Sequence, residues 1–115
     1  MVRHLRWNEV ENEFLKPGLE RQCVHTQQLT VARVLLKKGT VVPEHSHVNE
    51  QVTYILEGCL RFRLDGKIVD VHAGEVLCIP PNLRHSAEAL EDTVDLDIFN
   101  PVRQDWVDKT DAYIR

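Results

Sequence analysis

Short runs rich in apolar and β-branched residues, separated by turn signals, recur along this 115-residue chain. Such runs are typical of β-strands, and they cover residues 20–25, 29–37, 51–56, 60–64, 67–71, 75–79, 85–90 and 93–99. Asp65-Gly66 lies between two of these runs and is the two-residue signal of a tight β-hairpin. No stretch between Glu20 and Phe99 has the apolar spacing of an amphipathic helix. The sequence therefore predicts an all-β barrel of short strands.

A chain of this length is predicted to form a single domain, residues 1–115, because it can bury roughly two-thirds of its unfolded surface around one core. We expect residues 1–18 to be an N-terminal arm or lead-in strand, residues 20–99 to be the barrel and residues 101–115 to be a C-terminal tail. A turn of helix or a surface strap is expected in the tail. Trp106 there is expected to be a packing anchor, like Tyr113.

Two histidines near the middle of the chain have the spacing of metal ligands on a strand. Side chains alternate between the faces of a strand, so His45 and His47 point the same way and can close on one cation. Gln51 opens the next β-rich run and can bring its amide oxygen toward the same ion. Alone, such a histidine pair is more often a solvated or hydrogen-bonded feature. The block at residues 74–85 adds His85 after a strand and a Pro-Pro-Asn turn, which favours a metal site.

These two blocks resemble the two motifs of the cupin superfamily. The first motif, G(X)5HXH(X)3(E/Q)(X)6G, is matched by Gly39, His45, His47, Gln51 and Gly58. The second motif, G(X)5PXG(X)2H(X)3N, is matched by Gly74, Pro80 and His85, with Asn82 in place of glycine and Ala89 in place of asparagine. Asparagine also tolerates a left-handed turn conformation, so the first of these departures is mild. The resemblance implies a cupin jelly-roll barrel, also called a double-stranded β-helix, with a metal held by His45, His47, Gln51 and His85.

This ligand set indicates the chemistry of the metal more than its identity. Three neutral imidazoles and an amide oxygen leave the charge of a divalent ion uncompensated, which makes the ion a strong Lewis acid. Iron sites that activate dioxygen more typically carry two histidines and a carboxylate, so Gln51 weighs against oxidation. We expect one divalent metal ion per chain, with manganese, nickel or iron favoured by six-coordinate geometry and zinc as the alternative.

Charge and cysteine content limit the partners and the compartment. The chain has 14 Lys and Arg against 18 Asp and Glu, without a long block of either sign, so no nucleic-acid partner is expected. Three cysteines without paired spacing, Cys23, Cys59 and Cys78, indicate a reducing cytoplasm and are expected to be buried apolar fillers. No apolar run reaches the length of a signal peptide or of a membrane span. We therefore expect a cytoplasmic protein without a membrane partner.

The last strand, residues 93–99, can be placed in two ways. Composition alone slightly favours a core made of Val94, Leu96 and Ile98, which would leave the intervening aspartates in solvent. The cupin resemblance favours the opposite orientation, because small cupins commonly dimerise through outward apolar strand faces. The same reasoning applies to residues 51–56, where inward Gln51, Thr53 and Ile55 would leave Val52, Tyr54 and Leu56 outside. An apolar outer face needs a cover, so we expect a homodimer.

The segment from Leu90 to Arg103 resembles the small cupins of the KdgF type, which linearise unsaturated uronic acids in pectin and alginate breakdown. In that family the aspartate, the aromatic residue and the arginine of this strand line the pocket beside the metal. The resemblance therefore implies that Asp97 and Arg103 are catalytic and that Phe99 and Arg103 contact the substrate. From the residues alone, Arg103 is equally well explained as a surface residue after a strand end.

Together these expectations describe a small homodimeric cupin that acts on a small anionic or sugar-like substrate. The preferred reaction is ring opening of a 4,5-unsaturated monouronate to its linear keto form, in which Arg103 binds the substrate and Asp97 moves a proton. Two alternatives are a metal-dependent cupin dioxygenase, which would require dioxygen, and a non-catalytic cupin that binds a sugar or another small molecule.

Overall fold

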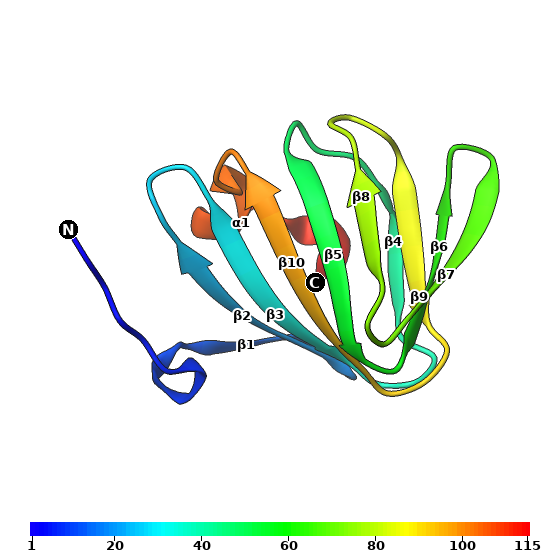
Figure 1. The fold of residues 1–115 in the computed structure, drawn as a ribbon, viewed down its shortest axis with the longest axis horizontal. Coiled ribbons are helices and arrows are strands. Elements are labelled where there is room, and N and C mark those ends of the chain that lie inside the picture. The colour runs from blue at the N-terminus through cyan, green and yellow to red at the C-terminus, as the bar shows by residue number, and fades with distance from the viewer.

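A computed structural model describes residues 1–115, and two antiparallel β-sheets form most of it (Figure 1). The elements are η1 (Trp7–Glu9), β1 (Asn12–Lys16), β2 (Leu19–His25), β3 (Thr30–Leu36), β4 (Val41–His45), β5 (Glu50–Glu57), β6 (Cys59–Leu64), β7 (Lys67–His72), β8 (Val76–Ile79), β9 (His85–Ala89), β10 (Thr93–Asn100), α1 (Gln104–Val107) and η2 (Ala112–Ile114). The prediction of an all-β jelly roll is confirmed. None of the three helices has the length and apolar character of a membrane-spanning helix.

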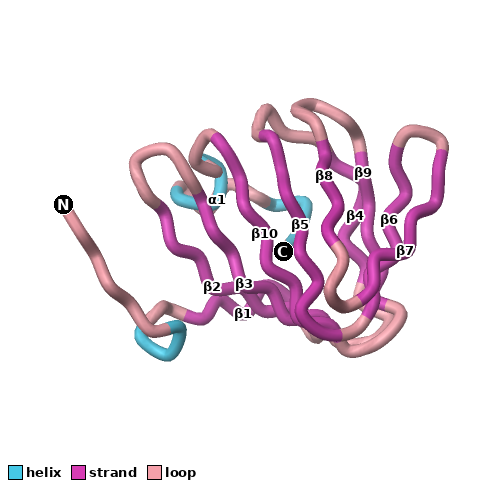
Figure 2. Tube along the Cα trace, viewed as in Figure 1, coloured by secondary structure: helices cyan, strands magenta, loops and turns pink.

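The two sheets differ in size and together enclose the core. The larger sheet has the strand order β1-β2-β3-β10-β5-β8, and the smaller has the order β4-β9-β6-β7. Figure 2 shows the strands of both sheets running between loops at the two ends of the barrel. The last strand, β10, lies between β3 and β5, so its inward face is central in the larger sheet.

Turn residues close the strands where the sequence predicts turns. Asp65 and Gly66 have φ values of 51° and 69°, and they join β6 to β7 with Leu64 paired to Lys67. Two consecutive positive φ values match the twist of a hairpin, which Asp-Gly adopts at low cost. Asn82 also has a positive φ, 66°, as its tolerance of the left-handed region suggested.

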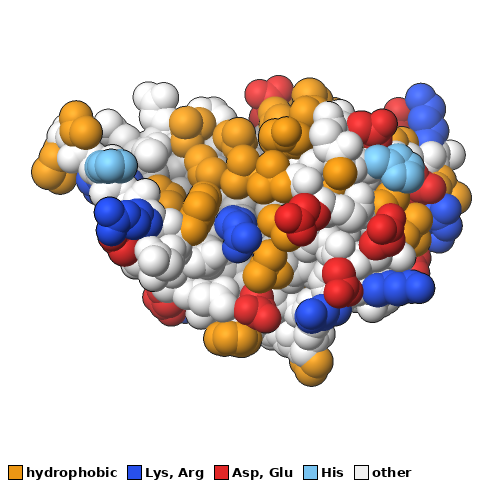
Figure 3. Space-filling model, turned by 60° about the horizontal axis from the view of Figure 1, so that its bottom comes forward, with side chains coloured by type: hydrophobic (Ala, Val, Ile, Leu, Met, Phe, Trp, Pro, Cys, Tyr) orange, Lys and Arg blue, Asp and Glu red, His pale blue; other side chains and the backbone are white.

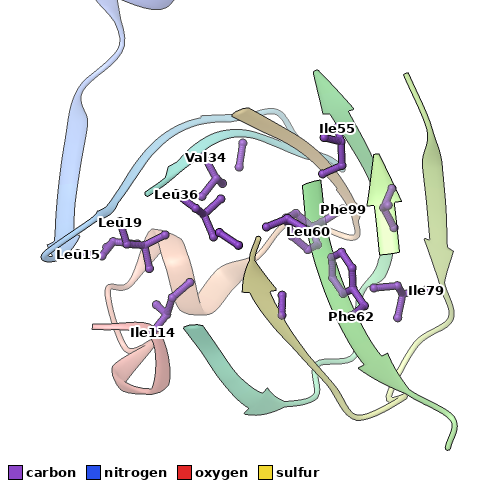
Figure 4. Close-up of a cluster of buried hydrophobic side chains, with 14 of the residues drawn as sticks. Leu15, Leu19, Val34, Leu36, Ile55, Leu60, Phe62, Ile79, Phe99 and Ile114 are labelled. Carbon is purple, nitrogen blue, oxygen red and sulfur yellow. The ribbon is translucent and has the colours of Figure 1, made fainter. Parts of the chain in front are cut away.

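Side chains from both sheets and from both ends of the chain meet in one apolar core (Figure 4). Full burial of each large aliphatic or aromatic side chain stabilises the fold by about 1.5–3 kcal/mol. The core includes Leu15 of β1, Trp106 of α1 and Ile114 of η2, so the arm and the tail both contribute to it. Its labelled members are Leu15, Leu19, Val34, Leu36, Ile55, Leu60, Phe62, Ile79, Phe99 and Ile114.

The outward face of β5 and its neighbours β10 and β8 is apolar. In β5, Tyr54 and Leu56 are 39% and 40% exposed, whereas Gln51, Thr53 and Ile55 are buried, as predicted. Figure 3 shows hydrophobic side chains gathered across one face of the molecule. The face continues onto β10 and β8, because Tyr54 pairs with Leu96 and Val76.

Two expectations from composition are wrong. Asp95, Asp97 and Phe99 face inward and are buried, whereas Ile98 faces outward. The prediction that Val94, Leu96 and Ile98 form part of the core is therefore wrong. The inward face of β10 instead contributes Asp95 and Asp97 to a polar site and Phe99 to the edge of the apolar core. Among the cysteines, Cys59 is buried and Cys23 is half-buried, but Cys78 is exposed. Cys78 pairs with outward-facing Val52 at the edge of the sheet, which places it outside.

Candidate metal centre

Three histidines from separate parts of the chain meet at one end of the barrel. His45 is the last residue of β4, His85 is the first residue of β9, and the two are paired across these strands. His47 lies just beyond β4, in the connection that leads to β5. Each ring offers one ligand nitrogen, and these atoms all lie within 4.8 Å of one another. The histidines predicted as ligands therefore share one site.

The backbone fixes the tautomer of each ring. Each Nδ1 lies near a backbone carbonyl two residues away, at 2.8 Å for His45 and Pro43, 3.0 Å for His47 and Asn49, and 2.8 Å for His85 and Leu83. A carbonyl can only accept, so Nδ1 carries the proton and Nε2 presents its lone pair. This is the arrangement in which metal-binding histidines are normally held.

Burial keeps the three rings neutral. It lowers the pKa of His45 and of His47 to about 4, and it also lowers the pKa of His85. An imidazolium loses its hydration when it is buried, and the neighbouring rings and Arg103 add positive charge. At neutral pH all three Nε2 atoms are therefore in the form that binds a metal.

Two features of the site fit a bound cation. The Nε2 atom of His85 is buried and has no hydrogen-bond partner. The Nε2 atom of His47 lies 3.0 Å from Oε1 of Gln51, although neither atom has a proton to share. Facing lone pairs repel each other, and a cation held by both atoms would remove that repulsion. The donor set thus fits a divalent metal ion, with His45, His47, Gln51 and His85 as the residues that would hold it.

A hydrogen-bond chain orients the Gln51 amide. Thr53 donates its hydroxyl proton to Oδ1 of Asp97 at 2.7 Å, so its oxygen accepts from Nε2 of Gln51 at 2.8 Å. This leaves Oε1 of Gln51 on the side of His47. The role of Thr53 was not predicted from the sequence, although its inward position two residues after Gln51 was the available signal.

Asp97 and Asp95 form a buried pair on the inward face of β10, 7% and 4% exposed. Burial raises the pKa of both carboxyls, and the neighbouring charge of Asp97 helps to put the pKa of Asp95 well above its ordinary value. Hydrogen bonds from Asp95 and Thr53 oppose the rise at Asp97. The pKa is raised more for Asp95 than for Asp97, which favours Asp95 as the protonated member of the pair.

Arg103 follows β10 and is only 1% exposed, so its interpretation as a surface residue is wrong. Its Nε and Nη2 atoms donate to Asp105 at 3.0 and 2.8 Å, and Nη2 also donates to the Tyr113 hydroxyl at 3.0 Å. The guanidinium lies over the rings of Phe99 and Trp106, 4.8 and 4.2 Å from their centroids. The third nitrogen, Nη1, makes none of these hydrogen bonds.

One cavity of about 50 Å³, enough for a few water-sized groups, is bordered by His45, Asp97 and Arg103 among others. The cavity therefore suits the reacting end of a small molecule. Phe99 packs edge-on against His47, with ring centroids 5.6 Å apart, and separates the histidines from Trp106. The polar and aromatic residues around the cavity are His45, Gln51, Phe62, His85, Asp95, Asp97, Phe99, Arg103, Trp106 and Tyr113.

Known structures and sequences resemble this chain to different extents. KdgF from Halomonas sp. has a TM-score of 0.86 and 28% sequence identity, over 92% of this chain and 99% of that chain. An RmlC-like cupin from Shewanella frigidimarina NCIMB 400 has a TM-score of 0.83 and 30% identity, over 91% of this chain and 96% of that chain. The 3-hydroxyanthranilate 3,4-dioxygenase of Candida albicans is 24% identical over 99 residues, 81% of this chain and 56% of the enzyme. The chain thus spans about half the length of that dioxygenase.

The sequence model of one protein family matches more than half of the chain. The family is described as the cupin domain, and the match runs over residues 32–100. This segment contains all four candidate metal ligands and the whole of β10. The chain therefore belongs to the cupin domain family.

Proposed function

We propose that this cupin is a metal-dependent enzyme that opens the ring of a 4,5-unsaturated monouronate and yields the linear keto form. The observation that carries the proposal is the inward face of β10, which brings Asp97 and Phe99 to the histidine cluster with Arg103 beside them. These three positions are the ones that the resemblance to KdgF-type cupins marks as functional. The structural similarity to KdgF from Halomonas sp. supports the same assignment.

The residues divide the task of binding between a cation and a guanidinium. A divalent metal ion held by His45, His47, Gln51 and His85 would polarise a substrate oxygen as a Lewis acid. Arg103 has Nη1 available for the substrate carboxylate, and a guanidinium binds a carboxylate with charge-assisted hydrogen bonds. Its contacts with Asp105 and Phe99 hold the group in place, so little conformational freedom is lost on binding.

Asp97 has the environment of a proton carrier. In the proposed reaction the anomeric hydroxyl loses a proton, the bond between C1 and the ring oxygen breaks, and C4 gains a proton, so substrate and product are isomers. The Asp97 carboxylate can accept the hydroxyl proton and can later return a proton to carbon. Hydrogen bonds from Asp95 and Thr53 favour the charged form of Asp97 and so oppose the effect of its burial.

An oxygen-free turnover assay tests this proposal. The conjugated double bond of an unsaturated monouronate absorbs in the ultraviolet and is lost in the product. We expect the metal-loaded protein to remove this absorbance under argon as fast as in air. No loss of absorbance with manganese, nickel, iron or zinc bound would refute the proposal.

A second candidate, an oxygen-dependent ring cleavage, is favoured by the similarity to 3-hydroxyanthranilate 3,4-dioxygenases. Besides the Candida albicans enzyme, that of Lodderomyces elongisporus is 28% identical over 94 residues, 76% of this chain and 52% of the enzyme. Gln51 stands where a carboxylate would be more typical of an iron dioxygenase, which makes this candidate the weaker one. Oxygen uptake by the iron-loaded protein with 3-hydroxyanthranilate would support it. Saturable binding of a uronate without either reaction would instead support a non-catalytic binding cupin.

A further inference from the structure

The C-terminal helix η2 brings an aromatic residue to the candidate metal centre that the function proposed above does not use. The Tyr113 ring stacks on His45, with ring centroids 4.3 Å apart and planes inclined by 23°. Tyr113 also borders the cavity that His85 and Asp97 border. Thus the end of the chain forms part of the wall of the site.

The hydroxyl of Tyr113 has a proton with no partner in the protein. Its oxygen accepts from Nη2 of Arg103 at 3.0 Å and from Nε1 of Trp106 at 3.4 Å. A guanidinium and an indole can only donate, and a phenol has two acceptor positions and one donor. Both acceptor positions are therefore used, and the phenol proton is available to an acceptor in the cavity.

The segment that carries Tyr113 is fixed in place. Asp111, 1% exposed, accepts from Nη1 of Arg21 at 2.8 Å and from Nε of Arg115 at 2.9 Å. Figure 4 shows Ile114 pointing into the core, and it is 5% exposed. A donor on such a fixed segment is preorganised, because binding need not order it.

We propose that Tyr113 is a substrate-binding residue, whose phenol donates a hydrogen bond to a substrate oxygen while Arg103 binds the substrate carboxylate. The two side chains act as one recognition unit, since Arg103 holds the Tyr113 hydroxyl through one nitrogen and offers another. The ligands that fit are small carboxylates with a hydroxyl or carbonyl oxygen near the carboxylate. This inference rests on the proposed function, which identifies the substrate as a uronate.

The chain has two tyrosines, which makes a clean test possible. Tyr113→Phe keeps the ring on His45 and removes only the donor, and Tyr54→Phe on the outer face of β5 is the matched control. We expect Tyr113→Phe to lower kcat/KM for the unsaturated monouronate about tenfold, the usual scale for one hydrogen bond. Metal content and Tm should stay near those of the wild type, and Tyr54→Phe should retain full activity.

A spectroscopic measurement separates this inference from the proposed function. In the zinc-loaded Tyr54→Phe protein labelled with 3-fluorotyrosine, the only fluorine signal comes from Tyr113. We expect galacturonate, a saturated uronate, to shift this signal saturably. A shift without turnover of the unsaturated uronate would support the inference and sink the proposed reaction. If the protein turns over the unsaturated uronate without a fluorine shift, and Tyr113→Phe is as active as the wild type, Tyr113 is only a packing anchor. If there is neither a shift nor turnover, the inference and the proposed function are both overturned.

Discussion

The hydroxyl of Thr53 donates a hydrogen bond to Oδ1 of Asp97 at 2.7 Å, inside the barrel. Because the hydroxyl proton is used in this bond, the Thr53 oxygen accepts a hydrogen bond from Nε2 of Gln51. This orients the Gln51 amide so that its Oε1 atom faces His47. One hydroxyl thus connects the candidate proton carrier with a candidate metal ligand. A substitution of Asp97 can therefore alter the orientation of the Gln51 amide through Thr53.

We predict that Thr53→Val weakens metal binding by about 10- to 100-fold, the usual cost of losing a group that orients a ligand. Valine has nearly the shape of threonine, so the loss comes from the missing hydroxyl. Competition with a coloured chelator measures the affinity. Thr93→Val is the control, because Thr93 is equally buried but bonds to the backbone of Cys59 and Glu91; an unchanged affinity in Thr53→Val would contradict this role of Thr53.

Replacing His47 or His85 by alanine should strip the metal and leave a folded barrel. Each change removes one nitrogen ligand, and neither histidine belongs to the apolar core. Elemental analysis of protein purified without a chelating resin, together with circular dichroism, checks both parts. Full metal occupancy in the two variants would sink the assignment of these ligands.

The outward face of β5 leads us to propose a homodimer. Substituting Tyr54 and Leu56 by aspartate should yield a monomer or an aggregate, because desolvating a charge in the covered face costs several kcal/mol. Ile68→Lys is a suitable control, since Ile68 is 61% exposed on the smaller sheet. Light scattering at micromolar concentration gives the mass, and a monomeric wild type would refute the proposal.

The ion pair that anchors the C-terminal tail should make stability depend on acid pH. Burial acts to raise the pKa of Asp111, but hydrogen bonds from Arg115 and Arg21 hold it below its ordinary value. Below about pH 4 the unfolded chain therefore binds a proton that the folded chain does not, so the free energy of unfolding falls as the pH falls. Asp111→Asn should lose about 2 kcal/mol at pH 7, since Arg21 and Arg115 each lose a charge-assisted hydrogen bond and Glu13 remains as the charged partner of Arg21.

Urea titrations at pH 7 and between pH 4 and pH 2.5 measure this effect. The difference between the wild type and Asp111→Asn should shrink as the pH falls through the lowered pKa of Asp111. A difference that stays constant with pH would mean that the carboxylate charge does not anchor the tail.

Local sequence patterns predicted the strands and the clustering of the three histidines, because these depend on short-range rules. Alternation along residues 51–56 placed Gln51 inside and Tyr54 outside, and the spacing of His45 and His47 predicted that their rings lie close together. The same alternation could not orient β10 without the family resemblance. Both of its faces carry apolar residues, and only its position between β3 and β5 decides which face is inward.

Features that depend on contacts between distant segments were not predictable. Tyr113 lies 68 positions after His45 and reaches it because Asp111 pairs with Arg21 of β2. The burial of Arg103 likewise follows from its contacts with Phe99 and Trp106. The sequence pattern, a charged residue after a strand end, does not predict these contacts. The role of Thr53 requires Asp97, a partner on another strand.

In the proposed function, the face of β10 that carries Asp97 supplies the proton carrier beside the metal, and one variant tests this most directly. Asp97→Asn keeps the shape of the side chain and can still accept from Thr53, but it cannot carry the reacting proton. With metal content measured in the same sample, kcat for the unsaturated monouronate should fall by roughly two orders of magnitude or more, the usual scale for a general acid or base. Undiminished turnover by a fully metal-loaded Asp97→Asn protein would contradict the claim.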